Sequence, residues 1–179
     1  LTYCSVNKSA HYSILYLKKK GGSGKLRTLY NPSPAMREIQ YKILTEILDH
    51  VEVPSYVYAF GKEKSIAKMA VLDTGKDVVL SLDIKDFFPS IHQCDLEDYF
   101  KKVGIGDAPA KLLSELCTYK YFVPQGSLTA PKLSNLITAA SFGREVQAYA
   151  QANGLTLSVY ADDITVSYNY SREEVYPQD

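Results

Sequence analysis

The sequence predicts an α+β fold in which a small antiparallel sheet packs with helices. Apolar and polar residues alternate over 155–161 and again over 164–168, and an Asp-Asp pair separates these two strand-like segments. Apolar residues recur at helical spacing elsewhere, most clearly over 34–51 and 130–152. The 179 residues suffice for one domain or for a compact pair of subdomains with a buried core.

A β-hairpin is expected near the start of the chain. Residues 15–20 lead into the glycine-rich segment 21–24, and a strand follows in which Lys25 and Arg27 share one face. Arginine offers a fork of N–H donors that matches phosphate oxygens. The hairpin is therefore expected to present Lys25 and Arg27 together to a phosphate group.

A helix and a strand come next. Ser33 is a suitable N-cap and Pro34 a suitable first helical residue, after which an apolar stripe continues to about Val51. The apolar run 77–83 then predicts a buried strand. Because a strand seldom ends in a charge, its last residue, Asp83, is a candidate functional residue.

The remaining elements are helices that lead into the acidic hairpin. Two short helices are expected over 93–103 and 108–117, with Asp107 as the cap of the second. A longer helix is expected over 130–152, because Asn-Gly at 153–154 ends it. It delivers the chain directly into the first strand of the hairpin.

Composition sets limits on the function. The chain has 20 basic and 20 acidic residues, so any affinity for nucleic acid must come from local patches or from another part of the protein. The three cysteines, Cys4, Cys94 and Cys117, are too far apart for a zinc site and odd in number, which argues against a disulfide framework. No signal peptide or transmembrane run is recognised, so a cytoplasmic protein without a membrane partner is expected.

The acidic pair in the hairpin predicts a metal site. Asp162 and Asp163 repel each other, and both remain ionised at low cost only when a cation neutralises them. An ordinary turn dipeptide is the alternative, and a third carboxylate, Asp83, favours the metal site. Oxygen ligands favour Mg²⁺ or Mn²⁺, and two ions about 3.5 to 4 Å apart would support phosphoryl transfer.

Five blocks of sequence, in the family's order, resemble the motifs of reverse transcriptases, and within them the bacterial retron and group II intron type. They are Lys25-Leu26-Arg27 with Pro32 and Ile39-Gln40, Phe60 with Ser65-Ile66 and Ala70, residues 81–91, residues 123–135, and Tyr160-Ala161-Asp162-Asp163. The resemblance implies a polymerase right-hand fold, with fingers over residues 1–75 and an antiparallel-sheet palm with packed helices over 76–179. No thumb is expected in this chain.

The same resemblance implies the catalytic residues. Asp83, Asp162 and Asp163 would be the catalytic carboxylates, and these three with the backbone carbonyl of Ile84 would be the metal ligands. Two Mg²⁺ ions are implied, with Mn²⁺ as the substitute. Asp83 and Asp162 are the expected direct ligands, and Asp163 is the third.

The resemblance also implies a nucleotide site. Its residues would be Lys25, Arg27, Asp86, Phe87, Phe88, Gln125 and Gly126. A bulky ring at Phe88 would clash with a 2′-hydroxyl, which favours deoxynucleotides. Two alternatives stay open. Phe87 and Phe88 could both be core residues, and Gln125-Gly126 could be an ordinary turn.

Template and primer contacts are expected at Gln40 and Tyr160, although Gln40 equally suits a solvent-facing position. Residues 18–20 suit either template phosphates or solvent.

The function expected from this resemblance is RNA-directed DNA synthesis by a fingers-and-palm fragment. The partners would be an RNA template, an RNA or DNA primer and dNTPs, with a structured non-coding RNA and an effector protein in an antiviral defence setting. Two alternatives remain. One is a template-independent DNA polymerase of the abortive-infection type, and the other is a catalytically silent scaffold that binds RNA or protein.

Overall fold

The computed structural model describes residues 7–18 and 26–170. The chain divides into two compact units, and each unit is made of two separate segments: Leu1–Glu52 with Asp86–Ile137, and Val53–Lys85 with Thr138–Asp179. The sequence predicted one boundary, between residues 75 and 76, whereas the chain passes from one unit to the other three times. The assignment of fingers and palm stays a prediction.

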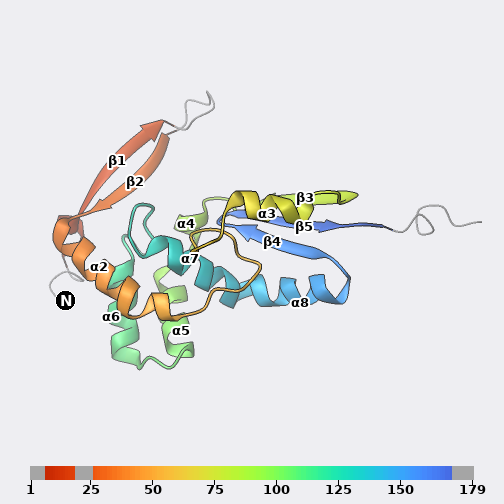
Figure 1. The fold of residues 1–179 in the computed structure, drawn as a ribbon. Coiled ribbons are helices and arrows are strands. Elements are labelled where there is room, and N and C mark those ends of the chain that lie inside the picture. Colours follow the sequence, from red (N-terminus) through yellow and green to blue (C-terminus); the bar gives the residue numbers. More distant parts are fainter. Residues whose placement is uncertain (1–6, 19–25, 171–179) are drawn as a thin grey trace, which may run out of the picture. The chain divides into compact units, whose positions relative to one another are not determined.

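The first unit contains a β-hairpin and a group of helices (Figure 1). Its elements are a 3₁₀ helix η1 (Lys8–His11), strands β1 (Tyr12–Lys18) and β2 (Leu26–Pro32), helix α2 (Pro34–Glu46), a 3₁₀ helix η2 (Leu48–His50), α4 (Phe87–Ser90), α5 (Gln93–Lys102), α6 (Asp107–Cys117) and most of α7 (Ala130–Thr138). Strands β1 and β2 pair antiparallel, with Tyr12 opposite Pro32 and Lys18 opposite Leu26. This confirms the expected hairpin, although its Lys25 lies outside the described residues.

Helix α2 begins as its sequence predicts. The Ser33 hydroxyl accepts a hydrogen bond from the Met36 N–H at 3.3 Å, and Pro34 is the first helical residue. The helix ends at Glu46, however, and a separate 3₁₀ turn follows, so the prediction of one helix to Val51 is wrong. Its buried face consists of Met36, Gln40 and Ile43.

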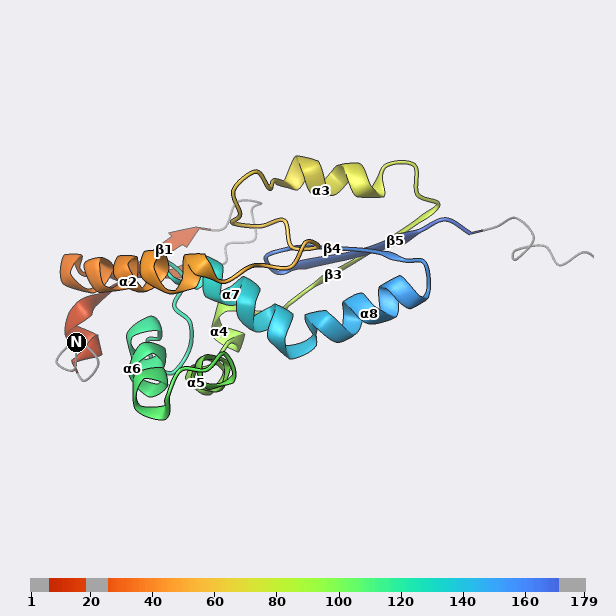
Figure 2. The same cartoon turned by 60° about the horizontal axis from the view of Figure 1, so that its bottom comes forward.

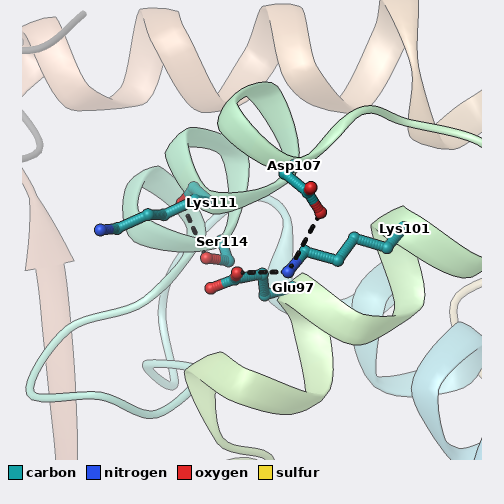
Figure 3. Close-up of polar contacts among 5 residues, drawn as sticks. All are labelled: Glu97, Lys101, Asp107, Lys111 and Ser114. Atoms are coloured by element: carbon teal, nitrogen blue, oxygen red, sulfur yellow. Dashed lines mark hydrogen bonds and ion pairs between the residues drawn. The ribbon is translucent and has the colours of Figure 1, made fainter.

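Helices α5 and α6 pack against each other and share a charged contact at their junction (Figure 3). The Lys101 amino group lies 2.8 Å from a carboxylate oxygen of Glu97 and 3.4 Å from one of Asp107. Asp107 was predicted to cap α6, but it is the first helical residue, and Gly106 is the N-cap. Its carboxylate therefore pairs across to α5 instead of capping its own helix.

The second unit is a three-stranded antiparallel sheet with helices on both sides (Figure 2). Its elements are α3 (Ile66–Asp73), β3 (Val78–Asp83), a π-helical segment η3 (Ala139–Gly143), α8 (Arg144–Ala152), β4 (Thr156–Tyr160) and β5 (Asp163–Tyr168). The strand order is β3-β5-β4, so β5 is central. Figure 2 shows α3 on one side of the sheet and α8 on the other.

Strand β3 is an exposed edge strand, and the prediction that it is buried is wrong. Val79, Leu80 and Leu82 are each about half exposed, at 49%, 53% and 52%. Helices α3 and α8 both pack against β4, at the opposite edge of the sheet. Among the described residues, β3 pairs with β5 alone, which leaves its apolar side chains uncovered.

The core of the second unit lies on the α8 side of β4 and β5. Its buried apolar residues are Tyr56, Val57, Ala150, Leu157, Val159 and Ile164. The backbone beside Val57 extends the sheet, because the Tyr58 N–H donates to the Val159 oxygen at 2.7 Å. The predicted long helix over 130–152 has the correct ends but contains the π-helical segment in its middle.

Candidate active site

Asp83 and Asp163 lie directly opposite each other on strands β3 and β5. The neighbouring Ile84 N–H donates to the Asp162 oxygen at 2.9 Å, which makes Asp83 and Asp163 a non-hydrogen-bonded pair. In such a pair the Cα atoms are about 4.5 Å apart and both side chains lie on the same face of the sheet. Two acidic side chains are therefore held together at the end of the sheet.

Asp162 lies in the two-residue turn that joins β4 to β5. Tyr160 pairs with Asp163, so Ala161 and Asp162 form the whole turn. Ala161 is buried and has a φ of 57°, in the left-handed region that residues other than glycine seldom adopt. Strain of this kind is concentrated at functional sites, and here it sets the direction in which the chain enters Asp162.

The neighbouring carboxylates affect Asp163. The pKa of Asp163 is raised, first by its partial burial and then by the negative charges of Asp162 and Asp83. A cation would relieve this repulsion, and the donor set of oxygens suits Mg²⁺ or Mn²⁺. Within the described residues, however, no three Asp, Glu, His or Cys side chains are gathered closely enough to hold a metal ion. The metal site therefore remains a prediction.

The Gln125-Gly126 loop of the first unit is fixed to strand β2. The Tyr30 N–H donates to the Gln125 oxygen at 2.8 Å. Gly126 has a φ of +116°, and a Cβ atom there would lie 2.7 Å from the Tyr30 oxygen. Only glycine fits this close approach. Arg27 is exposed on the same strand.

Gln40 is a buried structural residue. Its side chain is fully buried, and its Nε2 donates to the Tyr12 hydroxyl at 2.7 Å and to the Leu116 oxygen at 3.2 Å. Its Oε1 accepts from the Leu128 N–H at 3.3 Å. The prediction that Gln40 faces solvent or template is therefore wrong. Instead, Gln40 holds the segment that follows Gly126 against helix α2.

The two neighbouring phenylalanines differ in burial. The Phe87 side chain is 5% exposed and belongs to the core, whereas Phe88 is only partly buried. The nucleotide contact expected at Phe87 stays a prediction. Their ring centroids are 5.4 Å apart, so Phe87 supports the Phe88 ring. Asp86, exposed and with a φ of 51°, begins this turn of helix.

The predicted site residues fall into two sets, one in each unit. Asp83, Ile84, Tyr160, Asp162 and Asp163 belong to the second unit, and Arg27, Gln40, Asp86, Phe87, Phe88, Gln125 and Gly126 to the first. Sequence reasoning missed Tyr30, whose backbone fixes Gln125 and Gly126. No local pattern marks Tyr30, because its role arises from a contact with a distant part of the chain.

Comparison with known proteins gives a consistent result. The sequence model of the family described as "Reverse transcriptase (RNA-dependent DNA polymerase)" matches residues 17–176. The chain is 33% identical over 168 residues to the retron Ec86 reverse transcriptase of Escherichia coli, a match that covers 94% of this chain and 52% of that protein. It is 27% identical over 186 residues to the retron Mx162 reverse transcriptase of Myxococcus xanthus, covering 94% of this chain and 38% of that protein. The chain thus spans about half, or less, of the length of these curated relatives.

A solved structure shows the same fold. The structure of telomerase from Candida albicans in complex with a fragment of telomeric RNA matches with a TM-score of 0.59. The match covers 92% of this chain and 39% of that one, at 9% sequence identity, and so concerns the fold alone. This confirms the predicted mixed α and β architecture of the right-hand type. Separately, none of the helices in the described residues has the length and apolar character to cross a membrane.

Proposed function

This chain belongs to the reverse transcriptase (RNA-dependent DNA polymerase) family, and we propose that it forms the catalytic part of a retron-type enzyme that copies RNA into DNA. The matched relatives are retron reverse transcriptases, of which the chain spans about half the length or less. The activity proposed here therefore belongs to the whole polypeptide that contains this sequence.

The observation that carries the proposal is the arrangement of the carboxylates. Asp83 and Asp163 face each other across adjacent strands, and Asp162 lies in the turn beside them. Like charges placed directly opposite each other destabilise a sheet, so a purely structural role gives no reason to keep them. A role in binding a cation explains why the acids are kept together, because a bound cation would offset the burial and the like charges that raise the pKa of Asp163.

We assign each residue a task in nucleotidyl transfer. Asp83, Asp162 and Asp163, with the Ile84 carbonyl, would hold two Mg²⁺ ions. These ions would supply charge stabilisation when a primer 3′-hydroxyl attacks the α-phosphate of a dNTP and pyrophosphate leaves as the α–β phosphoanhydride bond breaks. Arg27 and Lys25 would bind the phosphates of that dNTP. Phe88 would lie beneath the sugar and exclude a 2′-hydroxyl, while Gln125 and Gly126 would line the pocket. Tyr160 would contact template or primer.

Primer extension tests the proposal. The natural polypeptide that contains this chain is given an RNA template with an annealed primer, dNTPs and Mg²⁺, beside its Asp162→Asn variant. Products that copy the template in the wild type and disappear in the variant would support the proposal. Products whose sequence ignores the template would indicate a template-independent polymerase of the abortive-infection type. If no product forms with any primer or metal, the catalytically silent binding scaffold would be the function that remains.

A structured non-coding RNA and an effector protein are further partners that we propose from the retron relatives.

A further inference from the structure

A second candidate site lies in the first unit, at a tight turn that the proposed chemistry does not use. Residues 119–122 form a tight β-turn with two central residues. The Tyr119 N–H donates to the Phe122 backbone oxygen at 2.9 Å, and the Phe122 N–H donates to the Tyr119 backbone oxygen at 3.2 Å. The two central residues, Lys120 and Tyr121, have φ angles of 51° and 66°. Turns with two such angles strongly favour Asn-Gly. Lysine and tyrosine therefore occupy this turn against their conformational preference, which points to a function for their side chains.

The base of this turn is firmly held. The Tyr119 ring packs against Tyr12 and Tyr30, with centroid distances of 4.7 and 5.4 Å, and Phe122 also contacts Tyr30 at 5.4 Å. The backbone oxygen of Tyr121 accepts a hydrogen bond from the Gln93 N–H at 2.8 Å. The turn is thus a rigid support, and the Tyr121 side chain on it is 76% exposed.

A cavity of about 400 Å³ lies beside the turn, lined by Lys8, Ser9, Gln93, Glu115, Tyr119, Lys120 and Tyr121. The Lys8 amino group donates to Gln93 Oε1 at 3.3 Å and to Thr118 Oγ1 at 3.4 Å. Its partial burial lowers the pKa of Lys8, and the Glu115 carboxylate opposes that shift. The cavity therefore combines a hydrogen-bond donor, an acceptor and an aromatic wall. Lys120 adds a positive charge at the rim, where its amino group lies 5.6 Å from the centre of the Tyr119 ring.

We propose that this cavity and the exposed Tyr121 ring bind one unpaired nucleotide of a single-stranded RNA. The base would stack on Tyr121 with its edge toward Lys8 and Glu115, and Lys120 would contact the adjacent phosphate. Aromatic rings beside basic groups are the usual means of holding unpaired bases, and stacking tolerates any base. The choice of RNA over DNA rests on the proposed function, whereas the site itself rests on the turn and the cavity.

Photocrosslinking locates the contact directly. The natural polypeptide is mixed with a short 5-bromouridine oligoribonucleotide, irradiated, digested and mapped by mass spectrometry. A crosslink to Tyr121 or its flanking peptide is expected. A crosslink map that omits residues 118–122 would overturn the proposal. If an oligodeoxyribonucleotide of the same sequence crosslinks here and binds as tightly as the oligoribonucleotide, the preference for RNA would be overturned.

A matched set of variants separates binding from folding. Tyr121→Gly removes the ring and also relieves the left-handed strain, so its melting temperature should equal or exceed that of the wild type. Its affinity for the oligoribonucleotide should fall between about fivefold and about a hundredfold, the range that loss of one base-stacking contact gives. Tyr121→Phe should retain the affinity. Tyr41→Ala removes another exposed tyrosine of this unit and should leave the affinity for the oligoribonucleotide unchanged. A Tyr121→Gly variant with unchanged affinity would refute the site.

The Asp162→Asn variant distinguishes this inference from the proposed function. It should lose DNA synthesis and keep the Tyr121 crosslink. Wild-type synthesis without the crosslink would mean that the RNA site is wrong and the enzyme assignment right. A crosslink without any synthesis by the wild type would mean that the RNA site is right and the enzyme assignment wrong.

Discussion

The backbone oxygen of Tyr30 lies so close to Gly126 that it leaves no room for a side chain there. A Cβ atom there would lie 2.7 Å from that oxygen, and the Tyr30 N–H also holds the Gln125 oxygen at 2.8 Å. Two segments far apart in the sequence are therefore locked together at the backbone level. The loop predicted to line the nucleotide pocket takes its shape from strand β2.

Gly126→Ala should destabilise the protein and impair nucleotide binding. The left-handed conformation costs about 1 kcal/mol for alanine, and displacement of Tyr30 adds to it, so a loss of about 2 to 3 kcal/mol is expected in denaturant unfolding. Gly104→Ala is the control, since Gly104 also has a positive φ, of +95°, but an added Cβ would contact nothing within 4 Å. Equal losses in the two variants would mean that the contact with Tyr30 is unimportant.

Asp163→Asn should raise thermal stability when no divalent ion is present. The change removes the like charge opposite Asp83, and the gain should be less than about 1 kcal/mol because the pair is partly solvated. Melting with EDTA measures it. Added Mg²⁺ should stabilise the wild type and have a weaker effect on Asp83→Asn. If Asp163→Asn melted at a lower temperature than the wild type, the acid would have a structural role.

Gln40→Leu should unfold more readily without a specific effect on template affinity. It leaves the Leu128 N–H and the Leu116 oxygen without their partner in the core, at a cost of about 2 to 4 kcal/mol. Tyr12→Phe, which removes the hydroxyl that Gln40 contacts, should have a smaller effect. Chemical denaturation and template titration together give the answer. Normal stability with weakened template binding would restore the original prediction of a template contact.

Phe88→Ala should admit ribonucleotides. Without the ring, the preference for dNTPs over rNTPs in kcat/KM should fall by at least about tenfold. Phe87→Leu is the control: because Phe87 lies in the core, this change should lower stability and leave sugar discrimination intact. Single-nucleotide incorporation assays measure both variants. Unchanged discrimination in Phe88→Ala would show that the residue is not the sugar gate.

Cys117 should resist alkylation in the folded protein, whereas the exposed Cys94 reacts. Burial raises the pKa of the Cys117 thiol to about 12, from an ordinary value of 9.0. Between these values the unfolded chain loses this proton first, so the contribution of Cys117 to stability falls as the pH rises from about 9 towards about 12. Maleimide labelling in a Cys4→Ser background, followed by mass spectrometry, tests the reactivity. Equal labelling rates at Cys94 and Cys117 would contradict the buried site.

Local chemistry made several features predictable. The cap at Ser33, the alternating strands around the acidic pair and the ends of the helical region 130–152 all depend on neighbouring residues, and the structure confirms them. Errors arose where packing decides. Strand β3 has the apolar composition of a buried strand but lies at the sheet edge, and its exposure depends on which elements cover it.

The sequence by itself determined the family, through motifs whose order and residue types match the reverse transcriptases. It also determined which carboxylates are candidates for catalysis. Only the tertiary structure decided that Asp163, rather than Asp162, pairs with Asp83 across the strands, and that Gln40 and Phe87 are buried while Phe88 is partly exposed. The physical reason is that cross-strand register and burial depend on contacts between distant segments, which local sequence patterns do not record.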